Sequence, residues 1–87
     1  MLKSKGTIRS LLNKIIWDPK LKEKNYLITF IHRGIPGNCK TIESKIIKGV
    51  SSNFISYIDK NDFTYIPFHR ILLIKDKDTN EVLYLKK

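Results

Sequence analysis

Both histidines of the chain stand directly before an arginine, in the dipeptides His32-Arg33 and His69-Arg70. These dipeptides hold two of the three arginines in a chain that otherwise uses lysine as its basic residue. A guanidinium is a planar fork that binds two phosphate oxygens at once, which an ammonium group does not do. An imidazole adds a donor whose charge changes near neutral pH. The two pairs therefore predict an anion site, provided that the fold brings them together.

Turn-forming residues lie beside each pair. Within Gly34–Asn38, Pro36 fixes φ for the second position of a β-turn, and Gly37 adopts the positive φ of a type II turn. Gly34 and Gly37 would also let backbone amides approach a phosphate oxygen closely. The second pair follows Pro67, which favours a bulge or an edge position in a strand. Strand ends and turns are places where ligands meet side chains and free N–H groups.

The same residues allow a purely structural interpretation. Two His-Arg dipeptides in 87 residues can arise by chance, and a histidine at a strand end often only completes a hydrogen bond. A hairpin also needs its turn whatever the function of the protein. Residue types and spacing alone leave these two interpretations open.

Three further residues are weaker candidates for supporting roles. Trp17 is either a core anchor or a platform for a base. Asp18 either orients a histidine or belongs to the turn that ends a helix. Tyr65, like Tyr57, either stacks on a base from a sheet face or packs within the sheet.

The composition is that of one folded domain spanning residues 1–87, with 41% hydrophobic residues. The net charge of +9 makes a polyanion the expected partner, either a nucleic acid or an anionic membrane. A single cysteine, Cys39, excludes an internal disulfide and a cysteine-clustered zinc site. With two histidines and few clustered carboxylates we expect no metal and no cofactor.

No apolar run approaches the roughly 20 residues that cross a bilayer, so we expect no membrane association and a cytoplasmic location. The hydrophobic pattern predicts a helix over Thr7–Trp17 that ends at Asp18-Pro19. A loop, 20–24, leads to a central strand over Tyr26–His32. The remaining strands are predicted over 39–43, 53–58, 63–66, 68–75 and 81–86. We therefore expect an α+β domain, with one N-terminal helix on a mostly antiparallel sheet of about five or six strands.

Three ordered motifs resemble a family of small, basic, mostly archaeal proteins, the UPF0248 type. They are LLNKIIWDP at 11–19, HRGIPG at 32–37 and IPFHRI at 66–71. The resemblance covers nearly the full chain, and Ile35 is a minor departure, because a small residue is usual there. The resemblance implies an RNA cyclic-phosphate-end recognition domain that works in RNA processing or repair, where related domains are fused to phosphoesterase or nucleotidyltransferase modules.

Carried over by motif, the family's candidate ligand residues in this sequence form one set, with Trp17 and Asp18 supporting them. The set is His32, Arg33, Gly34, Pro36, Gly37, His69 and Arg70.

Three functions fit the sequence. The first is a non-catalytic RNA-binding module that recognises a terminal phosphate, with Tyr65 or Trp17 stacking on the last base. The second is a metal-independent RNA phosphodiesterase or ribonuclease that uses His32 and His69 as base and acid. The third is a protein-interaction subunit that binds no RNA. The first, with an RNA-processing enzyme as a further partner, is our expectation, and the sequence favours a binder over an enzyme.

Overall fold

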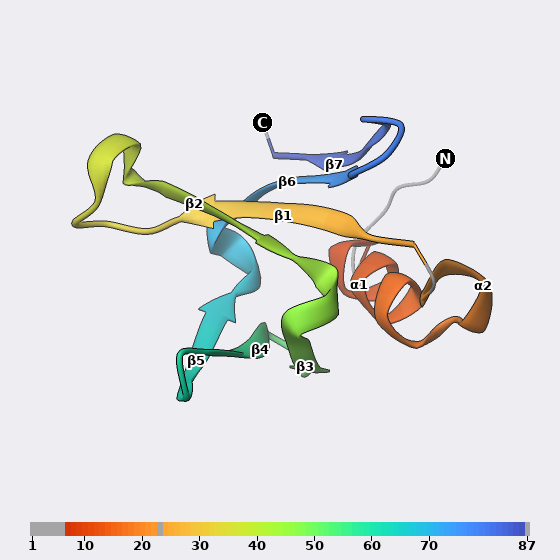
Figure 1. Cartoon of the computed structure of the whole chain (residues 1–87), viewed down its shortest axis with the longest axis horizontal. Helices are drawn as coiled ribbons and strands as arrows, with labels where there is room; N and C mark the ends of the chain where they lie inside the picture. The colour runs from red at the N-terminus through yellow and green to blue at the C-terminus, as the bar shows by residue number, and fades with distance from the viewer. Residues whose placement is uncertain (1–6, 23, 87) are drawn as a thin grey trace.

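Helix α1, Thr7–Trp17, packs with two antiparallel sheets around one core in this computed structural model, which describes residues 7–22 and 24–86 (Figure 1). The remaining residues of the predicted 1–87 domain, 1–6, 23 and 87, lie outside the described part. Along α1, Leu12, Ile15 and Ile16 are buried. The helix thus turns one apolar stripe to the core and ends at Trp17, as the sequence predicts.

A second, shorter helix, α2, Pro19–Lys22, occupies most of the segment predicted as a loop. Asp18 accepts a hydrogen bond through Oδ1 from the Lys20 amide at 2.9 Å. Aspartate before a helix and proline in its first turn are both favoured positions. The Asp18-Pro19 pair therefore ends α1 and also begins α2, which corrects the expectation of a loop.

The described residues contain seven strands in two sheets, where the sequence predicted one sheet of five or six strands. The strands are β1 Tyr26–Ile31, β2 Cys39–Glu43, β3 Ile47–Val50, β4 Phe54–Asp59, β5 Asp62–Pro67, β6 Ile71–Asp76 and β7 Val82–Leu85. One sheet has the order β2-β1-β6-β7 and the other β3-β4-β5, and all of their pairings are antiparallel. The α+β class with an N-terminal helix is confirmed.

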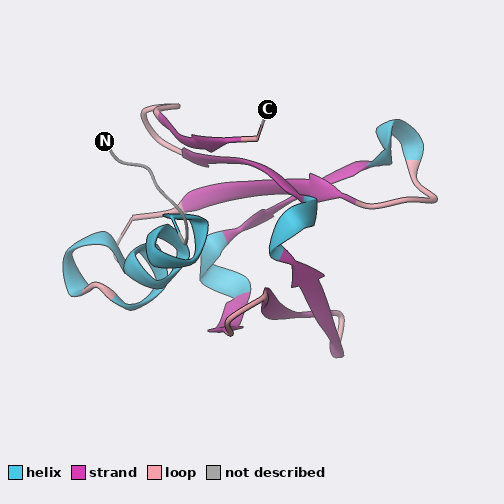
Figure 2. Ribbon diagram, turned by 180° about the vertical axis from the view of Figure 1, so that it is seen from behind, coloured by secondary structure: helices cyan, strands magenta, loops and turns pink. Residues whose placement is uncertain are grey.

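Short 3₁₀ turns carry the chain from one sheet to the other. The turn η2, Ser44–Ile46, joins β2 to β3, and η3, Phe68–Arg70, joins β5 to β6 (Figure 2). A third turn, η1, Pro36–Asn38, lies between β1 and β2. Pro67 is the last residue of the edge strand β5, as expected for a residue without an N–H group.

Strand β1 is central in its sheet, because β2 pairs with one of its edges and β6 with the other. Its first, third and fifth residues, Tyr26, Ile28 and Phe30, are buried, whereas the residues between them are half-buried. The ring centroid of Phe30 lies 6.3 Å from that of Tyr57 on β4. This contact joins the two sheets, and Tyr57 is a core residue that is closed to a ligand.

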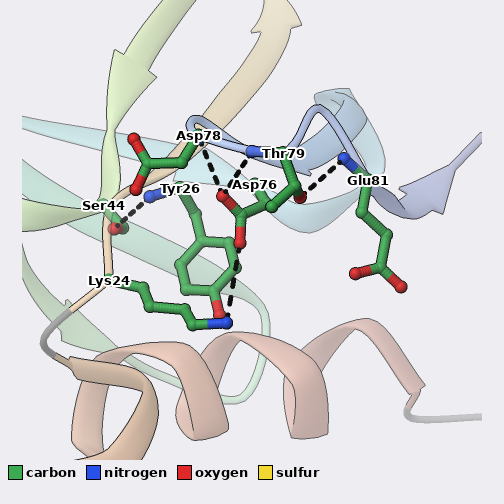
Figure 3. A network of polar contacts seen from close by, with 7 residues as sticks. All are labelled: Lys24, Tyr26, Ser44, Asp76, Asp78, Thr79 and Glu81. Carbon is green, nitrogen blue, oxygen red and sulfur yellow. Dashed lines mark hydrogen bonds and ion pairs between the residues drawn. The ribbon is translucent and has the colours of Figure 1, made fainter.

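A buried carboxylate closes the turn between β6 and β7 (Figure 3). Asp76 is 4% exposed, and its Oδ1 accepts hydrogen bonds from the amides of Asp78 at 2.8 Å and Thr79 at 3.1 Å. The Lys24 ammonium lies 3.9 Å from the other carboxylate oxygen. These contacts satisfy the turn amides and fix the start of β7 beside β6.

We expect Asp76→Ala to lower the free energy of unfolding by about 1–3 kcal/mol, because two amides and one ammonium lose their partner. Chemical denaturation followed by circular dichroism measures the change. Asp78→Ala is the matched control: its side chain is exposed, so its effect stays within about 0.5 kcal/mol. Equal losses in the two variants would contradict the role given to Asp76.

Candidate functional site

The two His-Arg pairs leave the same end of the β1–β6 ladder. Phe30, near the end of β1, pairs with Ile71, the first residue of β6. His32 follows Phe30 by two residues, and Arg70 directly precedes Ile71. Figures 1 and 2 both show η3 beside the tip of the β1 arrow. The antiparallel register thus places two dipeptides that are 37 positions apart in the sequence at the same end of the ladder.

The pairs are accessible to a ligand. Arg33, His69 and Arg70 are exposed, and His32 is half-buried. Among the described residues neither Arg33 nor Arg70 forms an ion pair. Guanidinium groups without a carboxylate partner are available to bind an oxyanion.

His32 is positioned by the core. Its backbone N–H donates to the Asn38 carbonyl at 2.9 Å, and its ring centroid lies 6.2 Å from that of Phe30. Residues two apart in an extended segment point to the same side, so His32 follows Phe30 toward the side occupied by the second sheet. The turn η3 connects the sheets on that side.

Two contacts hold η3 in place. The Phe68 amide donates to the Asn53 carbonyl at 2.8 Å, and the Lys86 ammonium donates to the His69 carbonyl. Lys86 also donates its amide to the Leu72 carbonyl at 2.8 Å. Sequence reasoning missed Lys86, because a single lysine looks like solvated surface until the β6–β7 pairing is known.

The β1–β2 loop extends beyond the sheet in both views (Figures 1 and 2). Gly37 has φ 79° and ψ −9°, and the Asn38 amide donates to the Ile35 carbonyl at 3.0 Å, which confirms the predicted type II turn. Gly34 also has a positive φ, of 94°. Arg33 and Gly34 lie where the loop leaves β1, whereas η1, with Pro36 and Gly37, lies toward the far end of the loop.

Trp17 and Asp18 lie at the other end of β1. Trp17 is 55% exposed and lines a hollow of about 310 Å³ with Ser44 of η2. The Ser44 hydroxyl accepts a hydrogen bond from the amide of Tyr26, the first residue of β1, at 3.0 Å. The fold therefore does not bring Trp17 and Asp18 to the His-Arg pairs, which lie beyond the opposite end of β1.

Tyr65 is connected to the His-Arg pairs through Phe54. The Tyr65 side chain is 56% exposed and meets the Phe54 ring edge-on, with centroids 5.2 Å apart. Phe54 lines an open groove of about 430 Å³ together with Pro67, Phe68 and His69. Phe54 is a site residue that sequence reasoning missed, because an aromatic residue at a strand start usually packs in the core.

Charges are separated along the four-stranded sheet. Glu43 and Asp76 lie opposite the first two residues of β1, and hydrogen bonds from Asn25 and Lys77 hold the pKa of Glu43 below its usual value. Nearer the His-Arg end, Lys40 binds Asp59 at 2.9 Å. This hydrogen bond lowers the pKa of the Asp59 carboxyl and raises that of the Lys40 ammonium. The two carboxylates on strands of this sheet, Glu43 and Asp76, thus lie at the end of β1 opposite the His-Arg pairs.

Within residues 7–22 and 24–86, no three His, Cys, Asp or Glu side chains gather as a metal site would require. None of the helices described here has the length and the apolar composition needed to span a bilayer. The chemistry that the described site offers is the binding of an anion by guanidinium, imidazole and backbone N–H groups.

Comparisons with known proteins identify the class of this domain. Residues 4–86 match the model of the MJ1316 RNA cyclic group end recognition domain, which confirms the resemblance seen in the three motifs. The chain belongs to this family, whose curated members among the relatives are archaeal UPF0248 proteins.

Several relatives match over most of their length. UPF0248 protein MJ1316 of Methanocaldococcus jannaschii is 40% identical over 80 residues, which are 92% of this chain and 94% of the relative. A UPF0248 protein of Methanococcus vannielii is 40% identical over 79 residues, 91% of this chain and 90% of its own. UPF0248 protein PYRAB10580 of Pyrococcus abyssi is 39% identical over 84 residues, 95% of this chain and 94% of its own. No solved structure matches the chain.

We expect Gly37→Ala to lower the free energy of unfolding by about 1–2 kcal/mol, the cost of a left-handed backbone for a residue with a Cβ. An added Cβ at this position meets no atom within 4 Å, so the loss arises from φ alone. Thermal or chemical unfolding measures it. Asn38→Gly is the control, because Asn38 already has φ 54° and tolerates glycine. A neutral Gly37→Ala would contradict the turn geometry.

Proposed function

We propose that this protein binds the 3′ terminus of RNA through His32-Arg33 and His69-Arg70 and prefers an end closed as a 2′,3′-cyclic phosphate. The observation that carries the proposal is the Phe30–Ile71 register, which sets both pairs at one end of the β1–β6 ladder. The description of the matching family, RNA cyclic group end recognition, supports the choice of ligand.

The chemistry of the ligand fits these side chains. A 2′,3′-cyclic phosphate carries one negative charge on two free oxygens. Arg33 and Arg70 both donate to these two oxygens, one of them through a pair of parallel N–H···O bonds. His32 and His69 donate further hydrogen bonds, and the backbone N–H groups that follow β1 complete the set. A linear phosphate has three terminal oxygens and more charge, so a preference for the cyclic end must come from the shape of the cyclic group and not from its charge.

The net charge of +9 supports binding to the phosphates that precede the terminus. Each phosphate neutralised by a lysine or an arginine releases counterions, so the affinity for RNA falls as salt is raised. This part of the binding does not depend on RNA sequence, whereas the cyclic end provides the selectivity.

A cyclic phosphate forms when the 2′-hydroxyl of RNA attacks the adjacent phosphate and breaks the chain. The ends are opened or joined again by phosphodiesterases and ligases. A binder of such ends therefore acts in RNA processing or repair, and an enzyme that modifies the same end is the partner we propose for it.

A short RNA that ends in a cyclic phosphate will bind about tenfold or more tightly than the same RNA ending in a hydroxyl or a linear phosphate. Arg33→Ala and Arg70→Ala will each lower the affinity for the cyclic end by about tenfold or more, or ~1.4 kcal/mol. Fluorescence anisotropy at two salt concentrations measures both effects.

Arg9→Ala is the matched control, because Arg9 is the third arginine and is exposed on α1. It will retain the preference for the cyclic end. Equal affinity for all three ends would reduce the function to general RNA binding. If the protein shows no salt-sensitive binding of RNA, the alternative of a protein-interaction subunit is favoured. Turnover of the cyclic end that is lost in His69→Ala would show an enzyme instead of a binder.

A further inference from the structure

The β4–β5 hairpin carries three of its four aromatic residues, Phe54, Phe63 and Tyr65, on the face that points away from the core. Ile55 and Tyr57 on β4 and Ile66 on β5 are buried, so the alternate residues of both strands face outward. Among these, Phe63 is 57% exposed and Tyr65 56% exposed. Two neighbouring aromatic rings that are more than half exposed on a small basic domain indicate a binding surface.

The rings form a continuous row. The centroids of Phe63 and Tyr65 lie 5.2 Å apart with the ring planes inclined by 33°, and Tyr65 meets Phe54 at the same distance, edge to face. Phe54 in turn lines the open groove that His69 also lines. The row Phe63–Tyr65–Phe54 therefore leads from the tip of the hairpin to the His-Arg end of β1, along the path that β5 and η3 take in Figure 1.

The charges along this path suit an RNA strand. Between Phe63 and Arg70, and between Phe54 and Ile58, the sequence holds no acidic residue. The carboxylates of the hairpin, Asp59 and Asp62, lie at its tip, and Asp59 is bound to Lys40. A polyanion can therefore follow the row of rings toward the His-Arg pairs without passing an acidic residue of these two segments.

The spacing of the rings selects unpaired bases. Stacked nucleotides of a duplex rise by about 3.4 Å per step, whereas the ring centroids of Phe63 and Tyr65 lie 5.2 Å apart. Bases that stack on successive rings must therefore move apart from one another. A base-paired end cannot expose its base faces in this way, because they are already stacked within the duplex.

We propose that the Phe63–Tyr65–Phe54 row binds the two or three unpaired nucleotides that precede the RNA terminus, so that the protein selects single-stranded 3′ ends over base-paired ones. This inference rests on the proposed function, because His69 and Arg70 hold the terminal phosphate at the end of the row. It extends the stacking role that the sequence suggested for Tyr65 on the last base to a row of three rings.

The test uses RNA hairpins that end in a cyclic phosphate after a 3′ overhang of zero, one, three or five nucleotides. The affinity of the full chain will rise about tenfold or more between the blunt end and three nucleotides, and little beyond. Tyr65→Ala will lower the affinity for the three-nucleotide overhang by about fivefold or more and leave that for the blunt end unchanged. Tyr65→Phe keeps the aromatic ring and will bind the three-nucleotide overhang as tightly as the unchanged protein.

Val82→Ala is the matched control, because Val82 is 51% exposed on β7, outside the row. Equal affinity for blunt and overhanging ends, or an unchanged Tyr65→Ala, overturns the stacking proposal, and the row is then a surface for a protein. If overhang length and Tyr65 matter but cyclic and hydroxyl ends bind equally, the stacking proposal holds and the proposed preference for cyclic ends fails.

Discussion

The β1–β6 ladder is the constraint on which the rest of the structure depends. Phe30 and Ile71 lie opposite each other in this ladder, and both are fully buried. If either strand slipped by one residue against the other, its buried side chains would move to the opposite face of the sheet. The register shifts between Thr29 and Phe30, which leaves one extra residue on β6. Such a bulge sets Ile71, rather than the residue after it, opposite Phe30. Because η3 ends directly before Ile71, the same shift decides how close the second His-Arg pair comes to the first.

Local pattern was sufficient to predict most of the elements, although it missed α2 and β3. The 3.6-residue period gave α1 with its correct end, and turn residues gave the β4–β5 hairpin and the type II turn at Gly37. The division into two sheets was missed, because it depends on which strands pair across long stretches of chain. The turn at Phe68–Arg70, which moves the chain from one sheet to the other, looks in sequence like the start of an ordinary strand.

The same limit applies to the candidate site. Residue types singled out the two His-Arg pairs, but only the topology says that they leave one end of one ladder. Trp17 was grouped with them as a supporting residue and lies instead with Ser44, at the opposite end of β1. Lys86 and Phe54 carried no sequence signal, because their contacts with η3 and with the groove exist only after β7 and β4 have paired. The groove then connects the second His-Arg pair to the row of exposed rings, because both His69 and Phe54 line it.

The most direct test of the shared site is a titration of the protein with a nucleoside 2′,3′-cyclic phosphate, followed through the imidazole NMR signals of His32 and His69. A mononucleotide has no preceding phosphates, so only the terminal group is tested. If both pairs bind one phosphate, the two histidines will shift together and give the same dissociation constant. A shift at one histidine with the other unmoved, or two different constants, would contradict a single shared site.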